Sequence, residues 1–141
     1  MKIVVLLFLP LLVWACSLPP KLTLAEVNPT RVYPTDKESL FQQIRMFSTR
    51  EGYKIERFEL ETGSIKGYKT VALQARAIGD PDATRQMIMT LRIKNLAPKS
   101  VELHASFSFG NYQGSFTAED EGILVSEYNN LFSSLDDQQQ K

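Results

Sequence analysis

The 141-residue chain has few of the residues that build disulfides and metal sites, with one cysteine and one histidine. A single cysteine cannot form a disulfide within the chain, and one histidine with one cysteine leaves no local zinc cluster. The chain also lacks an excess of either charge, since it has 16 basic and 16 acidic side chains. Because no basic excess is present to neutralise phosphates, nucleic acid is not expected as a partner.

The chain has little continuous apolar sequence. Its main apolar run, Ile3–Trp14, has 12 residues and contains Pro10, whereas about 20 residues are needed to cross the hydrocarbon of a bilayer. Hydrophobic residues nevertheless make up 43% of the chain, which is enough for a packed core and argues against disorder of the whole chain. At this length a single domain is expected.

The first 15 residues have the features of a secretion signal. Lys2 supplies a positive charge, the apolar run follows, and the small residue Ala15 lies where a signal peptidase would cut. We therefore predict a signal peptide over residues 1–15, which makes Cys16 the first residue of the mature protein.

The lone Cys16 has four interpretations: a spare core thiol, half of an intermolecular disulfide, a catalytic nucleophile or a chemical handle. The sequence Val13-Trp14-Ala15-Cys16 resembles the lipobox of bacterial lipoproteins, although Trp14 departs from the small residue that the pattern prefers. The resemblance implies diacylation of the Cys16 thiol and acylation of its new amino group, and several acyl chains anchor a protein stably in a membrane. A plain secretory signal with an incidental cysteine and a true membrane helix are the alternatives.

The lipobox resemblance also bears on location. In Gram-negative lipoproteins the residue after the cysteine helps sort the protein, and Ser17 is not the aspartate associated with retention in the inner membrane. The resemblance thus implies a protein anchored in the outer membrane and facing the periplasm.

Residues 16–35 are rich in proline and contain four of the seven prolines of the chain, Pro19, Pro20, Pro29 and Pro34. Proline lacks a backbone donor and favours extended conformations. We predict a semi-extended tether between the lipid and the domain. The alternative is that Leu22, Leu24 and Val27 dock on the domain as an edge segment.

Residues 36–135 carry the pattern of a single α+β domain. A capping box at 35–38 and apolar residues at helical spacing predict a helix over 36–51, which Gly52 ends. Four runs of alternating apolar and polar residues then predict strands within 53–61, 68–77, 85–94 and 101–109. The alternation slips at Arg57, which predicts a bulge or twist there.

A second amphipathic helix is predicted after Thr117–Asp120, and residues 136–141 are predicted to be a disordered tail. The order α-β-β-β-β-α with short loops predicts a four-stranded antiparallel meander sheet with both helices on one face. An alternative closes the sheet around one helix as a grip. Residues 39–67 resemble the helix, Gly-Tyr, strand, turn and strand unit of helix-grip modules in envelope lipoproteins, such as the C subunit of the outer-membrane barrel assembly machine.

The sequence predicts no catalytic, cofactor-binding or metal-binding residues and hence no enzyme. His104 can titrate near neutral pH, but no Ser/His/Asp arrangement follows from the spacing. The predicted function is a non-enzymatic adaptor or assembly factor that binds another envelope protein. Its predicted partner-binding face is the solvent side of the sheet, with Thr70, Gln74, Arg76, Thr90, Arg92, Glu102 and His104.

A second functional class stays open. The protein would bind a small hydrophobic molecule or a cell-wall fragment, or act as a minor hydrolase, through a pocket between helices and sheet. That pocket would be lined by the aromatic residues Phe41, Phe47, Tyr53, Phe107 and Tyr128.

Overall fold

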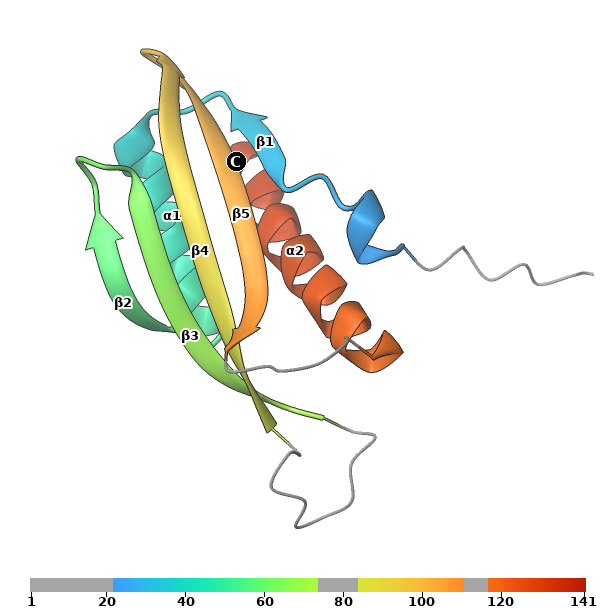
Figure 1. The fold of residues 1–141 in the computed structure, drawn as a ribbon. Helices are drawn as coiled ribbons and strands as arrows, with labels where there is room; N and C mark the ends of the chain where they lie inside the picture. The colour runs from blue at the N-terminus through green and yellow to red at the C-terminus, as the bar shows by residue number, and fades with distance from the viewer. Residues whose placement is uncertain (1–21, 74–83, 111–116) are drawn as a thin grey trace, which may run out of the picture.

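A computed structural model describes residues 22–73, 84–110 and 117–141 of the chain. The predicted signal peptide, Cys16, Gln74 and Arg76 lie outside these residues. The described chain is an α+β fold with a five-stranded antiparallel sheet and two helices (Figure 1). Its elements in order are η1 (Leu24–Glu26), β1 (Thr30–Tyr33), α1 (Lys37–Arg50), β2 (Lys54–Glu59), β3 (Ser64–Ala72), β4 (Thr84–Ala97), β5 (Ser100–Gly110) and α2 (Ala118–Gln139).

The sheet has the strand order β1-β5-β4-β3-β2. Strands β2 to β5 form the predicted antiparallel meander. The fifth strand corrects the prediction of four: Thr30–Tyr33, placed in the tether by sequence, pairs antiparallel with β5. Its Tyr33 side chain is only 3% exposed, so burial of this residue opposes an extended tether there. The alternative of a docked segment fits better, because Leu24 and Val27 also pack against the core.

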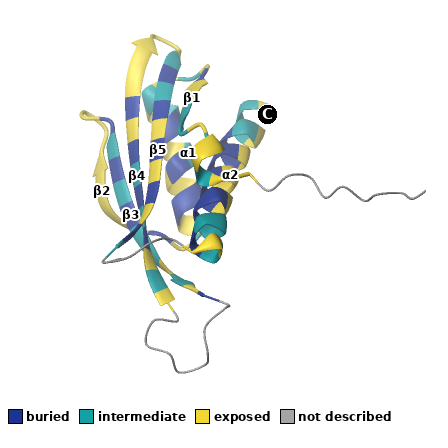
Figure 2. Cartoon of the chain, turned by 45° about the vertical axis from the view of Figure 1, so that its right-hand side comes forward, coloured by how far each residue is buried: buried dark blue, intermediate teal, exposed yellow. Residues whose placement is uncertain are grey.

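Both helices lie against the same face of the sheet, and the core fills the space between them (Figure 1). Burial alternates along β4 and β5, as the period of two predicted (Figure 2). Met87 and Met89 are fully buried next to Leu91, so they fill the core. Complete burial of such a side chain contributes about 1.5–3 kcal/mol to stability. In the described part of the chain, no helix is both long and apolar enough to cross a bilayer.

The helix ends differ in part from the prediction. Asp36 caps α1 by accepting a hydrogen bond from the Ser39 backbone N–H at 2.8 Å, so the capping box predicted at Thr35 is wrong. The second helix does follow Thr117, which is its N-cap and forms a capping box with Asp120. Helix α2 continues to Gln139 rather than fraying at residue 136. The Gln139 amide donates a hydrogen bond to the Gln43 side chain at 3.0 Å and ties this last turn to α1.

The bulge predicted at Arg57 is confirmed by a register shift between Ile55 and Arg57 in the pairing of β2 with β3. The turn that follows β2 depends on Gly63, which has φ 70°. A Cβ at this position would lie 2.0 Å from the Ile93 carbonyl oxygen, so only glycine fits. The Gly63 carbonyl in turn accepts the Ile93 N–H at 2.8 Å and fixes the turn against the end of β4.

Candidate partner-binding face

The sheet face opposite the helices, called the outer face below, carries the five described residues of the predicted partner-binding set. Thr90 on β4 lies between Lys66 on β3 and Ser106 on β5, and Thr70 lies opposite Gln86. Paired residues of an antiparallel sheet share a face, and these positions alternate with buried residues such as Met89. The structure thus brings Thr70, Thr90, Arg92, Glu102 and His104 together on one face.

His104 lies where β1, β5 and β4 meet. It is opposite Arg92 on β4 and Thr30 on β1, and its Nδ1 is 2.9 Å from the Thr30 hydroxyl oxygen. The sequence did not predict this hydroxyl partner because residues 30–33 were assigned to the tether. Within the described ranges, no group of three or more His, Cys, Asp and Glu side chains could hold a metal ion.

The outer face carries charges of both signs. Lys66 forms an ion pair with Glu56 at 3.0 Å, and Lys94 lies opposite Glu102 in the strand register. Among residues that the structure describes, Arg92 has no acidic partner. An exposed guanidinium without a partner is a ready donor for a carboxylate, since its N–H groups match that geometry.

The outer face also has a hollow of about 360 Å³ beside Thr70 and Thr90. Tyr68 and Ile88, both half-buried and opposite one another in the strand register, line it, and so do Lys66 and Glu56, which form an ion pair. The lining thus combines an aromatic and an apolar side chain with charged and polar ones, which can offer a partner both apolar contact and hydrogen bonds. The sequence did not predict this hollow, because its lining residues come from three strands, β2, β3 and β4, that only the strand register brings together.

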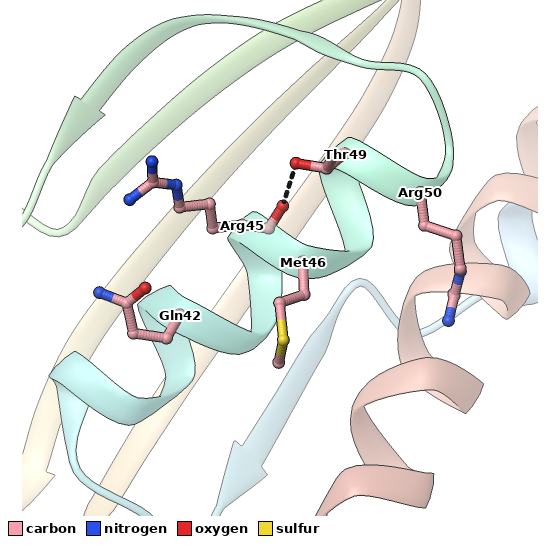
Figure 3. A pocket seen from close by; sticks show the side chains of 5 residues that line it. All are labelled: Gln42, Arg45, Met46, Thr49 and Arg50. Carbon is pink, nitrogen blue, oxygen red and sulfur yellow. Dashed lines mark hydrogen bonds between the residues drawn. The ribbon is translucent and has the colours of Figure 1, made fainter.

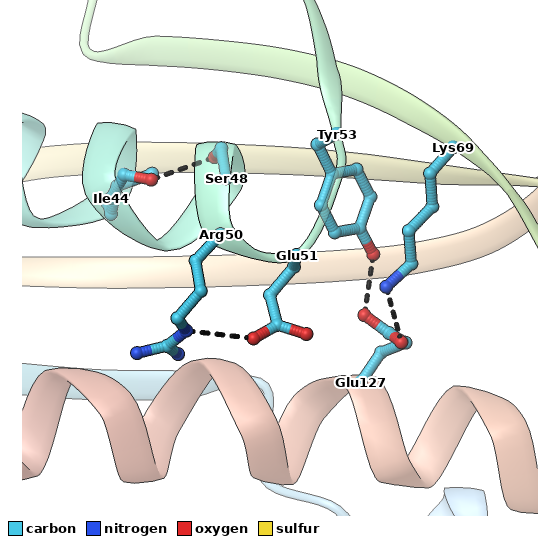
Figure 4. A network of polar contacts seen from close by, with 7 residues as sticks. All are labelled: Ile44, Ser48, Arg50, Glu51, Tyr53, Lys69 and Glu127. Atoms are coloured by element: carbon cyan, nitrogen blue, oxygen red, sulfur yellow. Dashed lines mark hydrogen bonds and ion pairs between the residues drawn. The ribbon is translucent and has the colours of Figure 1, made fainter.

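A buried polar network lies on the other side of the sheet (Figure 4). The Tyr53 hydroxyl donates a hydrogen bond to Glu127 Oε2 at 2.7 Å, and Lys69 Nζ is 2.8 Å from Glu127 Oε1. The same ammonium lies 4.5 Å from the centre of the Tyr53 ring. The Lys69 and Glu127 side chains are only 13% and 9% exposed, respectively.

This network joins the residue before β2 to β3 and to α2, and its closure to solvent makes it a structural link. Burial, with the hydrogen bond to Glu127 second, raises the pKa of Tyr53 far above its ordinary value. This network was not predicted from the sequence, although two charged residues at inward positions indicate it. Lys69 is in phase with the inward positions Ile65 and Val71 of β3, and Glu127 lies in the apolar stripe of α2.

A second surface lies on α1, where Gln42, Arg45, Met46, Thr49 and Arg50 line a shallow depression (Figure 3). Met46 is 59% exposed there, and the Thr49 hydroxyl donates to the Arg45 carbonyl at 3.0 Å. All five residues come from one helix, so groups from different elements do not converge on this depression. The outer face is therefore the stronger candidate site.

The aromatic residues of the alternative ligand pocket pack against one another. The ring centroids of Phe107 and Tyr128 are 4.8 Å apart, and those of Phe47 and Tyr53 are 6.3 Å apart. Phe41 packs edge-on against Phe58 at 5.0 Å. All five predicted pocket residues are buried, so their rings occupy the space between helices and sheet.

Comparison with protein-family models and with curated proteins finds no match. Among solved structures, the chain is similar to a chain of the adenylate sensor from AMP-activated protein kinase, crystallised in complex with the ribofuranotide ZMP. The TM-score is 0.50 at 11% sequence identity, over 74% of this chain and 93% of that chain. A likeness at this identity concerns the fold alone.

Proposed function

We propose that this protein is a lipid-anchored envelope lipoprotein that acts as a non-enzymatic adaptor or assembly factor for another envelope protein. One observation carries the adaptor function: the helices cover only one face of the sheet, and the outer face holds a hollow lined by Tyr68 and Ile88 together with charged and polar residues. Arg92, without a partner among the described residues, adds a cation to that face. We infer a partner that presents an acidic side chain beside an apolar one.

The proposed anchor is Cys16, acylated in the outer membrane and facing the periplasm. From Cys16 to Leu22, where the described chain begins, there are six residue steps (22 − 16), which span at most roughly 22 Å. Soon afterwards the Leu24 N–H donates a hydrogen bond to Glu121 of α2 at 2.7 Å. A lipid at Cys16 would therefore hold the domain close to the bilayer, because no long linker separates the two.

The finer fold class that we propose is a helix-grip-like module. Two helices on one face of an antiparallel sheet support it, as does the helix, Gly52-Tyr53, strand and turn succession over 39–67. The packed aromatic rings weigh against the ligand-binding alternative, because they fill the place where its pocket would lie.

Mass spectrometry of the native protein tests the anchor. The expected N-terminal peptide begins at Cys16 and carries the mass of the acyl chains, and Cys16→Ser releases the protein from the membrane fraction or leaves it uncleaved. An unmodified thiol at a mature N-terminus contradicts the anchor.

Site-specific photo-crosslinking in intact cells of the native host tests the adaptor function. A photoreactive residue at Thr90, on the outer face, should give one adduct of defined mass that Arg92→Glu weakens. The matched position is Thr49 on the exposed side of α1, which should give none. The same background from both positions contradicts a partner on the outer face.

A further inference from the structure

Strand β2 leaves one edge of the sheet open. It is the last strand in the order and pairs only with β3 among the described residues. All six of its residues are exposed. Of the seven large apolar side chains that are exposed in the described chain, three lie at this edge, namely Ile55, Phe58 and Leu60. An open edge with apolar side chains is a template for another strand.

The bulge in β2 gives the strand a symmetric order of faces. Ile55 lies opposite Gly67 and Phe58 opposite Ile65, so both are on the helix side. In a regular strand, residues three apart would face opposite sides. Because the bulge adds Glu56, Lys54, Arg57 and Glu59 lie on the outer side together with Glu56, and Ile55 and Phe58 lie on the helix side.

The charges of β2 change sign across the bulge: residues at equal distances on its two sides carry opposite charges. The strand reads Lys-Ile-Glu-Arg-Phe-Glu over 54–59. Placed antiparallel to itself, it pairs Lys54 with Glu59 and Glu56 with Arg57 on the outer side. On the helix side it pairs Ile55 with Phe58. Each of these pairs is an opposite-charge or an apolar pair, the kinds that stabilise neighbouring strands.

We propose that β2 pairs antiparallel with β2 of a second copy of this chain, about a two-fold axis at the bulge. The two five-stranded sheets then form one continuous sheet of ten strands. The two-fold symmetry repeats every contact, so each complementary pair counts twice. Ile55 and Phe58 of both copies, each 37% exposed in the single chain, would cover one another beside α1.

The charge order selects a second copy over an unrelated strand. Bulges and edge charges usually keep sheet edges apart. Here the outer charges of β2 alternate in sign along the strand, and an antiparallel copy of β2 places an opposite charge against each of them. A parallel copy would place Lys54 against Lys54. The same side chains thus repel most strands and attract their own copy, which is how complementary charges confer specificity. The pairing would also join the outer faces of two copies into one surface.

Proximity at the axis is tested by disulfide crosslinking of the full chain in intact cells. Arg57→Cys places a thiol at the proposed axis, where it would meet its own copy. Ser108→Cys, exposed on the outer face of β5, is the matched control, and the wild-type chain sets the background from Cys16. After mild oxidation, a dimer is expected from Arg57→Cys alone. A yield no higher than that of Ser108→Cys overturns the proposal.

Charge exchange tests whether the partner is the chain itself. Lys54→Glu should raise the dissociation constant of the dimer about tenfold, since it places like charges at two symmetric contacts. The double exchange Lys54→Glu with Glu59→Lys should restore it, as measured by native mass spectrometry of the full chain in detergent. Both side chains are exposed, so at protein concentrations too low for association the unfolding midpoint should stay unchanged and report intact folding. A double variant that dimerises no better than Lys54→Glu, or a chain that is monomeric throughout, overturns the proposal.

Discussion

The two edges of the sheet are treated differently. At the β1 edge, a side chain of β1 packs against α2: the Arg31 guanidinium lies 4.3 Å from the Phe132 ring centre and forms an ion pair with Asp136 at 2.5 Å. Beyond Thr30, where β1 begins opposite His104, the N–H of Phe107 on β5 donates to the Tyr128 hydroxyl at 3.2 Å. A helix thus supplies the partners that a further strand would supply. This hydrogen bond and the contacts of Arg31 tie the β1 side of the sheet to α2.

At the β2 edge, the strand is exposed and its charged side chains pair with one another. Arg57 and Glu59 form an ion pair at 3.5 Å with both side chains at least half exposed. Such a pair is weak in water and can exchange partners at little cost. The comparison teaches that this fold stabilises one edge by burial and leaves the other available for association. Substitutions that break contacts between α2 and the sheet should therefore cost far more stability than substitutions of exposed side chains on β2.

Glu127→Ala should have the largest effect, because it breaks the network that fixes β3 and the start of β2 to α2. It leaves the Lys69 ammonium buried without its carboxylate, and removal of one partner of a buried ion pair costs about 3–5 kcal/mol. The free energy of unfolding from urea titration measures the loss. The control is the double variant Lys69→Met with Glu127→Leu, which removes both charges and should cost less than Glu127→Ala. Equal losses would mean that apolar packing, and not the ion pair, dominates there.

Tyr128→Phe should come next, because it removes the group that satisfies the Phe107 N–H. A buried donor left without an acceptor costs about 1–3 kcal/mol. Hydrogen exchange of the Phe107 amide should accelerate by more than that of the Ala105 amide, which retains the Pro29 carbonyl at 2.8 Å. An unchanged Phe107 amide would show that water replaces the hydroxyl and that α2 does not close this edge.

The sequence predicted the parts of the fold that depend on local periodicity. The stripes at 36–51 and after Thr117 became α1 and α2, and alternation over 85–94 and 101–109 lies within β4 and β5. It missed β1, because four residues between prolines carry too short a pattern to register as a strand. Their pairing partner is β5, 74 residues away for Thr30 and His104, and no local rule reports it.

The candidate site was predicted less completely, for a related reason. Period two correctly placed Thr90, Arg92, Glu102 and His104 on one side of the sheet. It could not indicate the hollow between Tyr68 and Ile88, nor the contact of Thr30 with His104, since both need the strand register. The charged Lys69 at an inward position of β3 was the one local sign of the buried network, and its partners lie on other elements.

Arg31→Ala should cost about 1–2 kcal/mol at the covered edge. It removes an ion pair that is half exposed and worth at most about 1 kcal/mol, and a contact with the Phe132 ring that adds about 0.5–1 kcal/mol. The guanidinium also covers apolar surface of α2 with its stem. The change in unfolding free energy should shrink by about half in 1 M salt, because salt screens the exposed ion pair. A salt-independent loss would assign the whole effect to packing.

Arg57→Ala is the matched variant at the open edge and should have the smallest effect. Its ion pair with Glu59 is exposed on both sides, and no ring or helix in the described chain covers its side chain, so the single chain should lose less than about 0.5 kcal/mol. The measurement is the free energy of unfolding at protein concentrations too low for association. At higher concentration the same variant should lose more, because each two-fold contact of Glu56 with Arg57 would be missing. A large loss at low concentration would show that the β2 edge is held by its charges within one chain, and the contrast between the two edges would then disappear.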